Sequence, residues 1–158
     1  IASQSRRLAN ALRKHGILAG DRVALLLPQC IETVVAHIAV YRLGAIAVPL
    51  ALLFGPEALA FRLNFSSARA VVTNAAGLEK VSLIDQEIPE LSIMFCTDGS
   101  NGNARDFHQE IAESSPRFTN IDTRRDTPAL MIFTSGTTGP PKGALILNES
   151  KGGGGVYT

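Results

Sequence analysis

The residues of this sequence that are best suited to chemistry stand together between 133 and 143, where the chain reads FTSGTTGPPKG. A polyphosphate needs several donors that converge on its oxygens and a backbone that can approach them closely. The stretch supplies hydroxyl groups, glycines that permit positive φ angles and a mobile positive charge. In chain order these residues are Thr134, Ser135, Gly136, Thr137, Thr138, Gly139 and Lys142. Their types and spacing predict a phosphate-binding loop.

Two other interpretations of this stretch use the same residues. A solvated linker has a similar composition, although apolar segments flank the stretch on both sides, at 129–133 and 144–147. The common nucleotide-binding loop requires Gly-Lys-Ser/Thr at the start of a helix. Here Pro141 precedes Lys142 and Gly143 follows it, so that pattern is absent. On composition alone, both the linker and the phosphate-binding loop stay open.

The composition restricts the class of protein and its partners. The chain has 158 residues, of which 46% are hydrophobic, and a formal net charge of +1. This length and apolar content are typical of one globular domain. The balanced charge argues against a nucleic-acid partner.

The sequence also carries signals for its compartment. Cys30 and Cys96 are too few and too far apart for a disulfide framework, which favours a reducing cytoplasm. The sequence predicts neither a transmembrane segment nor a secretory signal. Because the chain begins at Ile1 without Met, we expect an upstream piece to be missing.

Helical and strand patterns alternate along the chain and must position the loop. We predict helices around 8–15, 31–39, 56–63, 78–87 and 107–113, and strands around 22–27, 45–48, 70–73, 92–96 and 129–133. In the second helix, we expect an apolar face formed by Ile31, Val34, Val35, Ile38 and Ala39. Strands separated by helices indicate an α/β fold with a mainly parallel sheet and helices on both of its faces.

The segment TSGTTGPPKG over 134–143 resembles the signature loop of the adenylate-forming (AMP-binding) superfamily, which comprises acyl-CoA synthetases, luciferases and the adenylation domains of peptide synthetases. It matches nine positions of the TSGTTGxPKG pattern, which chance produces at roughly 10⁻¹¹ per window. Three other segments resemble the family's sequence around its first strands and before the loop: Gly20–Ala24, Leu43–Leu50 and Asp126–Leu130. The resemblance extends over about Ser3 to Leu145, and 45–63 is most similar to bacterial short- and medium-chain acyl-CoA synthetases.

This resemblance implies an enzyme that activates a small carboxylic acid with ATP. The carboxylate attacks the α-phosphorus, pyrophosphate leaves, and the thiol of coenzyme A then attacks the acyl-adenylate. The family uses Mg²⁺ with ATP, and the implied partners are the acid, ATP, coenzyme A and the rest of the same polypeptide. Carried over to this sequence, Thr134, Ser135, Gly136, Thr137, Thr138 and Gly139 would surround the pyrophosphate, and Lys142 would reach it from the end of the loop.

The sequence also departs from the family pattern. After 142–144 the family usually has a hydroxyl and a His that begin a helix, whereas 145–150 contains no His. The adenine, ribose and acyl pockets and the C-terminal catalytic Lys belong to later segments of the family. We therefore expect 1–147 to be the N-terminal α/β segment of an AMP-binding domain, and 148–158 a flexible or out-of-register tail. The segment alone is predicted to be inactive.

Two alternative functions remain: an amino-acid-adenylating domain or another ligase of this superfamily, or a non-catalytic phosphate-binding module. No catalytic residue and no metal ligand is assigned. His15 is expected at a helix end without partner residues, and Phe54 and Phe61 are more typical of core packing than of an acyl pocket.

Overall fold

A central β-sheet organises the chain in the computed structural model, which describes residues 1–134 and 141–148. Within these residues the sheet has seven strands in the order β5-β4-β3-β1-β2-β6-β7. All neighbouring strands run parallel except β6 and β7, which form an antiparallel pair. The strands are β1 (Arg22–Leu26), β2 (Ile46–Pro49), β3 (Ala68–Thr73), β4 (Ile93–Cys96), β5 (Arg105–Asp106), β6 (Pro128–Thr134) and β7 (Lys142–Leu147). The predicted α/β fold with a mainly parallel sheet is confirmed.

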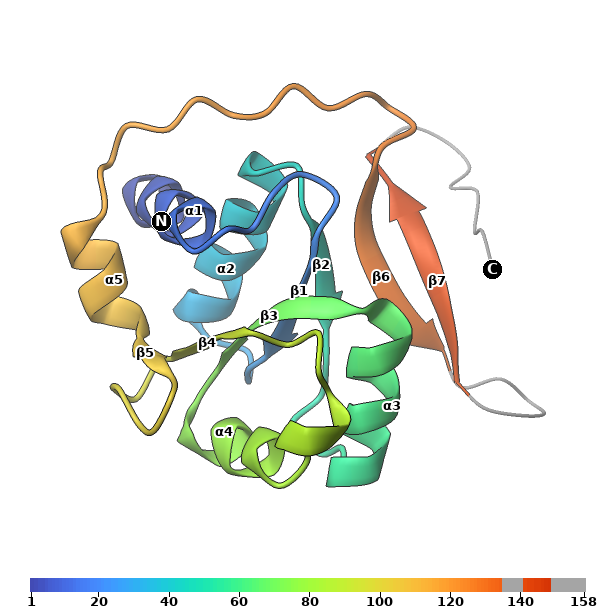
Figure 1. The fold of residues 1–158 in the computed structure, drawn as a ribbon. Helices are drawn as coiled ribbons and strands as arrows, with labels where there is room; N and C mark the ends of the chain where they lie inside the picture. The colour runs from blue at the N-terminus through green and yellow to red at the C-terminus, as the bar shows by residue number, and fades with distance from the viewer. Residues whose placement is uncertain (135–140, 149–158) are drawn as a thin grey trace.

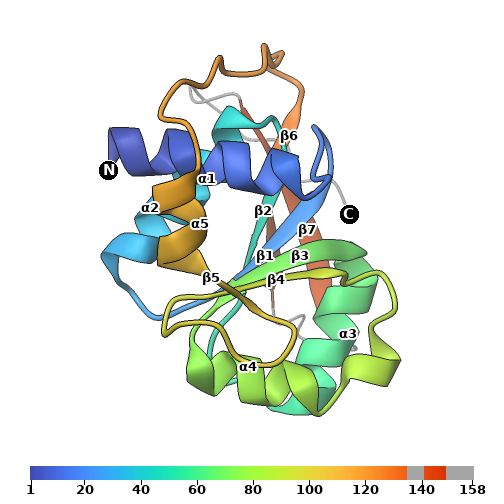
Figure 2. The ribbon, with the colours of Figure 1, turned by 60° about the vertical axis from the view of Figure 1, so that its left-hand side comes forward.

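Helices cover both faces of the sheet (Figures 1 and 2). They are α1 (Ala2–Lys14), α2 (Ile31–Arg42), α3 (Pro56–Ser66), α4 (Ala75–Ser82) and α5 (Phe107–Glu113), with a 3₁₀ turn, η1 (Asp85–Glu87). Helices α1, α2 and α5 pack on one face, and α3 and α4 on the other. Because successive side chains of a strand point to opposite faces, Val23 and Leu25 of β1 enter the first core, whereas Ala24 and Leu26 enter the second.

Local sequence explains where several helices begin and end. Pro56 occupies the first turn of α3. A backbone N–H at this position has no partner within the helix, so its absence in proline removes no helical hydrogen bond. The side chain of Asn74 accepts a hydrogen bond from the Gly77 N–H at the start of α4, and Asp106 caps α5 through the Gln109 N–H. Gly16, with φ of +89°, follows α1 in the conformation that favours glycine.

The structure corrects two details of the predicted helices. The buried face of α2 is formed by Val35, Ala36, Ala39 and Val40. Ile31 and Val34 are 63% and 46% exposed. They lie outside the side of α2 that packs against α1 and the sheet. The helix predicted over 78–87 is instead α4, which ends at Ser82, followed by the separate turn η1.

A buried carboxylate joins α1 to α5, and this corrects the expectation that His15 has no partner. Glu110 of α5 is only 7% exposed. Its Oε1 atom lies 2.9 Å from Nε2 of His15 and 3.4 Å from Nη1 of Arg105, and its Oε2 atom lies 3.5 Å from Nζ of Lys14. His15 therefore has a structural role at the helix end.

Across the part of the chain that the structure describes, none of the helices has the length and apolar character needed to cross a membrane.

Candidate functional site

The antiparallel hairpin of β6 and β7 holds the two ends of the predicted phosphate-binding loop beside each other (Figure 1). Thr134, the last residue of β6, pairs with Lys142, the first residue of β7, and Phe133 pairs with Gly143. Both Thr134 and Lys142 are exposed. Since β6 runs parallel to β2, Thr134 lies at the carboxyl edge of the sheet, where α/β folds bind their ligands.

The structure thus brings together two of the seven predicted site residues. Thr134 supplies a hydroxyl and Lys142 an ammonium group at the same end of the hairpin. The other five, Ser135, Gly136, Thr137, Thr138 and Gly139, lie outside the described residues.

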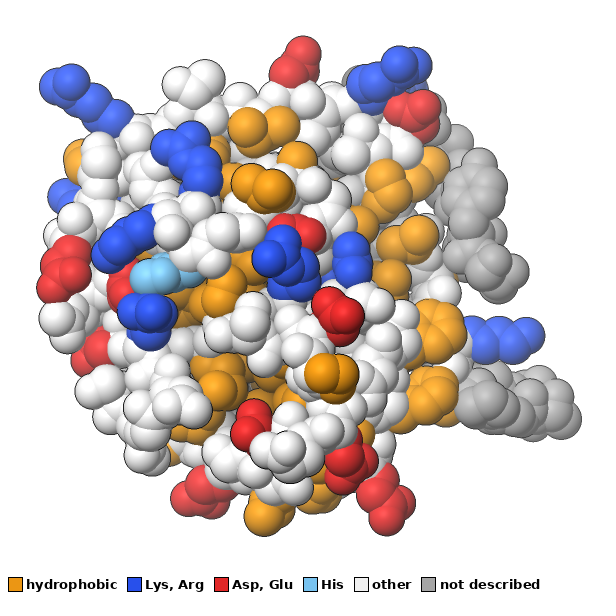
Figure 3. All heavy atoms as spheres, viewed as in Figure 1, with side chains coloured by type: hydrophobic (Ala, Val, Ile, Leu, Met, Phe, Trp, Pro, Cys, Tyr) orange, Lys and Arg blue, Asp and Glu red, His pale blue; other side chains and the backbone are white. Residues whose placement is uncertain are grey.

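The two faces of the hairpin differ. Met131 and Phe133 of β6 and Leu145 of β7 pack against the core beneath α3. On the opposite face, Ile132 and Ile146 are each 36% exposed, and hydrophobic side chains are visible over β6 and β7 (Figure 3). Helix α3 therefore holds the hairpin from one side only.

A side chain of α3 lies close to the hairpin at Gly143. A Cβ atom at this position would lie 2.7 Å from Cε1 of Phe65 and 3.4 Å from Sδ of Met131. Contacts below about 3 Å are repulsive, so the absence of a side chain at Gly143 lets the Phe65 ring lie against the backbone of β7. The last glycine of the sequence pattern thus has a packing role.

Arg62 of α3 contacts the residue before the predicted loop, and sequence reasoning missed it. Its Cζ atom lies 3.9 Å from the ring centre of Phe54 and 5.6 Å from that of Phe133. In the sequence, Arg62 stands three residues after the buried Leu59, and residues three apart are neighbours on the surface of a helix. This spacing was the signal that could have pointed to Arg62.

The two aromatic residues considered for an acyl pocket have different environments. Phe54 is half-buried against the guanidinium group of Arg62. Phe61 is 37% exposed and its ring centre lies 5.9 Å from that of Phe65. Packing therefore accounts for Phe54, while Phe61 lies on the outer surface of α3.

A second segment of the sequence resemblance, Gly20–Ala24, has a structural role. Nε and Nη2 of Arg22 donate hydrogen bonds of 2.6 and 2.9 Å to the carbonyl oxygens of Ser66 and Ser67. Oδ2 of Asp21 accepts hydrogen bonds from the Leu18 N–H and from Nη1 of Arg69. These contacts fix the end of α3 and the starts of β1 and β3.

Within 1–134 and 141–148, no three His, Cys, Asp or Glu side chains gather so that they could hold a metal ion. Mg²⁺ therefore stays an expectation from the sequence resemblance.

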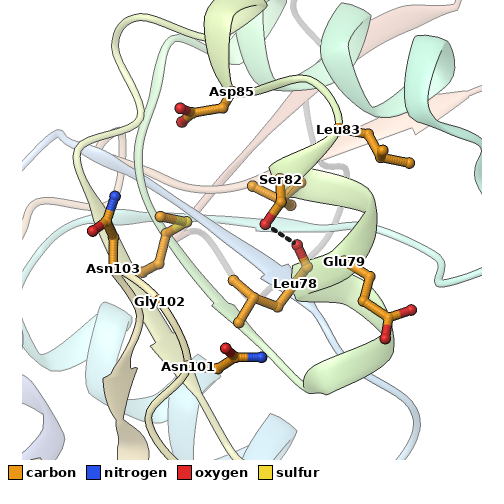
Figure 4. A pocket seen from close by; sticks show the side chains of 10 residues that line it. Leu78, Glu79, Ser82, Leu83, Asp85, Asn101, Gly102 and Asn103 are labelled. Carbon is orange, nitrogen blue, oxygen red and sulfur yellow. Dashed lines mark hydrogen bonds between the residues drawn. The ribbon is translucent and has the colours of Figure 1, made fainter.

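A pocket of about 590 Å³ lies elsewhere, between α4, η1 and the turn that follows β4 (Figure 4). Leu78 and Met94 form its apolar part, and Asn101 and Asn103 are among its polar lining. In the sheet, β4 is separated from β6 by β3, β1 and β2. Of the predicted site residues that the structure describes, neither Thr134 nor Lys142 lines this pocket.

Two curated relatives match nearly all of the chain. It is 33% identical to an acetyl-coenzyme A synthetase of Agrobacterium fabrum over 172 residues, an alignment that covers 96% of this chain and 26% of the relative. It is also 33% identical to an acetyl-coenzyme A synthetase of Brucella canis, with 88% of this chain and 24% of the relative covered. The chain therefore spans about a quarter of the length of these relatives.

Solved structures agree with this relationship. An anthranilate CoA ligase in complex with anthranoyl-AMP superposes with a TM-score of 0.90 at 25% identity, covering 94% of this chain and 29% of that one. An acyl-CoA synthetase of Brucella canis superposes with a TM-score of 0.83 at 32% identity, covering 93% and 27%. Both contain a region folded like the present chain.

A family model described as AMP-binding enzyme matches residues 1–150 and thus includes the hairpin and both ends of the predicted loop. The fold and the sequence motif lead to the same assignment as this match. The chain belongs to the AMP-binding enzyme family of adenylate-forming acid ligases.

Proposed function

We propose that this chain is the N-terminal segment of an ATP-dependent acid–CoA ligase and that it holds the phosphates of ATP that leave as pyrophosphate. The observation that carries the proposal is the pairing of Thr134 with Lys142. In the sequence, the segment 135–141, with its hydroxyls and glycines, connects these two paired residues. An anion bound there would meet hydroxyl donors and the charge of Lys142 together.

The proposed reaction has two steps. A carboxylate oxygen attacks the α-phosphorus of ATP, so that a new P–O bond forms while the bond to the β-phosphate oxygen breaks. The thiol of coenzyme A then attacks the acyl carbon of the acyl-adenylate, a thioester forms, AMP leaves and the thiol proton is released. Both reactants of the first step are anions, so fixed donors around the leaving group contribute by positioning and by charge stabilisation.

Within this reaction, we assign the chain's own residues to the leaving group. The hydroxyls of Thr134, Ser135, Thr137 and Thr138 donate to pyrophosphate oxygens, while Gly136 and Gly139 let backbone N–H groups approach. Lys142 contributes a point charge. Mg²⁺ would enter with the ATP phosphates, since the described residues contain no cluster to hold it.

The names of the relatives support coenzyme A as the acceptor and a small organic acid as the substrate. The curated relatives above are acetyl-coenzyme A synthetases, and the anthranilate enzyme is also a CoA ligase. These names favour an acid–CoA ligase over an amino-acid-adenylating domain. We place the protein in the cytoplasm, where Cys30 and Cys96, which form no disulfide, would stay reduced.

The segment by itself is proposed not to turn over. It corresponds to about a quarter of the relatives' length, and the acid, adenine and coenzyme A pockets are assigned to the remaining part. We keep 1–147 as the α/β segment and 148–158 as a flexible or out-of-register tail; residues 149–158 are not among those described.

The test combines binding and turnover. The intact mass of the natural polypeptide first decides whether the chain occurs alone. The 158-residue chain is then titrated with inorganic pyrophosphate while the amide signals of Thr134 and Lys142 are followed, with chloride at equal ionic strength as the control. We expect saturable shifts at both residues. No shift would contradict the phosphate site.

Turnover is tested by acid-dependent exchange of pyrophosphate into ATP. We expect exchange with the full-length enzyme and none with the isolated chain. Exchange by the isolated chain would overturn the proposed inactivity. A natural polypeptide of this size that binds nucleotide without exchange would instead be a non-catalytic module.

A further inference from the structure

The guanidinium group of Arg62 lies between two aromatic rings from different parts of the chain. Its Cζ atom is 3.9 Å from the ring centre of Phe54, in the segment between β2 and α3, and 5.6 Å from that of Phe133 at the end of β6. Nη1 donates a hydrogen bond of 2.8 Å to the carbonyl oxygen of Ala58. Nε is buried, and it lacks a hydrogen-bond partner.

This arrangement is unusual for a half-buried arginine. A buried N–H without an acceptor is disfavoured, so the two ring contacts and the bond to Ala58 must hold the side chain in place. Cation–π contacts between a guanidinium group and aromatic rings are favourable, and the planar group stacks in a defined orientation. Arg62 thus fixes the positions of Phe54 and Phe133 relative to α3.

Phe133 connects this cluster to both ends of the predicted loop. It directly precedes Thr134, and it pairs across the hairpin with Gly143, the neighbour of Lys142. The ring of Phe65 supports the same place, with its centre 5.6 Å from that of Phe133 and its edge against the backbone of Gly143. Helix α3 therefore contacts both strands at the level where the loop begins and ends.

We propose that Arg62 is a positioning residue for the phosphate site: by its contact with Phe133 it sets where Thr134 and Lys142 stand relative to the sheet. This inference rests on the proposed function for its effect on binding. Its structural part, the placement of the two strand ends, is independent of any ligand. Arg62 is not assigned a contact with substrate.

Three variants of the chain separate positioning from charge. Arg62→Met keeps the apolar stem and removes the guanidinium group. Arg62→Lys keeps the charge but lacks the planar group. Phe54→Leu leaves Arg62, α3 and both hairpin strands intact and removes the ring that lies 3.9 Å from the guanidinium group. The matched control is Arg13→Met, because Arg13 also lies over an aromatic ring, that of Phe118, at 4.9 Å, but in α1.

The first readout is the position of the amide signals of Thr134 and Lys142 in the ligand-free chain. We expect both to shift in Arg62→Met and in Phe54→Leu and to stay in place in Arg13→Met. The second readout is the dissociation constant for inorganic pyrophosphate. We expect it to rise between about twofold and thirtyfold in Arg62→Met, the range for loss of a partly buried cation–π contact, and to rise similarly in Arg62→Lys.

Unchanged amide signals in Arg62→Met would overturn the inference. Full recovery of affinity in Arg62→Lys would also overturn it, because the charge alone would then account for the effect. If the unsubstituted chain does not bind pyrophosphate, the proposed function fails, while the amide signals still decide whether Arg62 places the strand ends. If Arg62→Met fails to fold, Phe54→Leu supplies the same test with α3 and both hairpin strands unaltered.

Discussion

The ring of Phe65 occupies the space that a side chain at residue 143 would need. Its Cε1 atom lies 2.7 Å from the place of a Cβ atom on Gly143. This contact joins the end of α3 to the start of β7, next to Lys142. A glycine that the sequence motif associates with phosphate binding therefore also allows a helix to pack on the hairpin.

Gly143→Ala should destabilise the chain by about 1–2 kcal/mol, as overpacking does at a tight contact. Phe65 is 53% exposed, so its ring can move outwards and keep the cost moderate. In a Phe65→Ala background the same substitution should be neutral or stabilising, because alanine restricts the unfolded chain more than glycine does. Urea unfolding of the four proteins measures this coupling. An equal cost in both backgrounds would mean that Phe65 is not the obstacle.

Glu110→Gln should destabilise the chain by about 1–3 kcal/mol, the range for hydrogen bonds to a charged group. The substitution removes the charge that holds Lys14 of α1, His15 directly after α1 and Arg105 of β5. Glu113→Gln is the matched control, since it makes the same chemical change on the same helix at an exposed position, where Gln109 donates a hydrogen bond to it. Thermal unfolding compares the two variants. Similar losses in both would exclude a special role for the Glu110 cluster.

The Glu110 cluster also predicts a pH dependence of stability. Burial alone raises the pKa of Glu110, but the hydrogen bond and charge of His15 and the charge of Lys14 outweigh it and lower the pKa below its ordinary value of 4.5. The carboxylate is therefore favoured in the folded state. Its contribution is fully present above the pKa of the unfolded chain and is lost as the pH falls through the lower folded value.

Urea midpoints measured from about pH 6 down to about pH 3 test this dependence. The unsubstituted chain should lose more stability than Glu110→Gln over the acid part of this range, and the two curves should converge. Parallel curves would show that Glu110 titrates with the same pKa in the folded and unfolded chain.

Lys142→Ala should weaken ATP-dependent activation by the complete enzyme by about 1–3 kcal/mol, the range for a charge-assisted contact. The exposed ammonium group carries little of the fold, so its loss should leave the unfolding midpoint unchanged. Lys151→Ala makes the same change of charge outside the motif and serves as the control. Steady-state kinetics with ATP as the varied substrate measure the effect. An unchanged kcat/KM in Lys142→Ala would remove this residue from the mechanism.

The sequence determined the order and type of most elements, because hydrophobic period and helix-start signals are local properties. Phe107–Glu113 is a helix with the predicted bounds, and Pro56 begins α3 as Gly55-Pro56-Glu57 indicates. The motif over 134–143 also identified the family. These features depend on residues that are close in the chain, so one sequence is enough to find them.

The tertiary structure decided which apolar residues are buried and which residues support the site. Ile31 and Val34 fit the helical period as well as Val35 does, yet they are exposed, because the position of α1 and the sheet selects the buried stripe of α2. Likewise, the partner of His15 lies 95 residues away in the chain. The contact of Arg62 with Phe133 joins a helix to a strand that is distant in sequence. Such pairs are fixed only when the strands take their order in the sheet, and no local pattern of residues encodes that order.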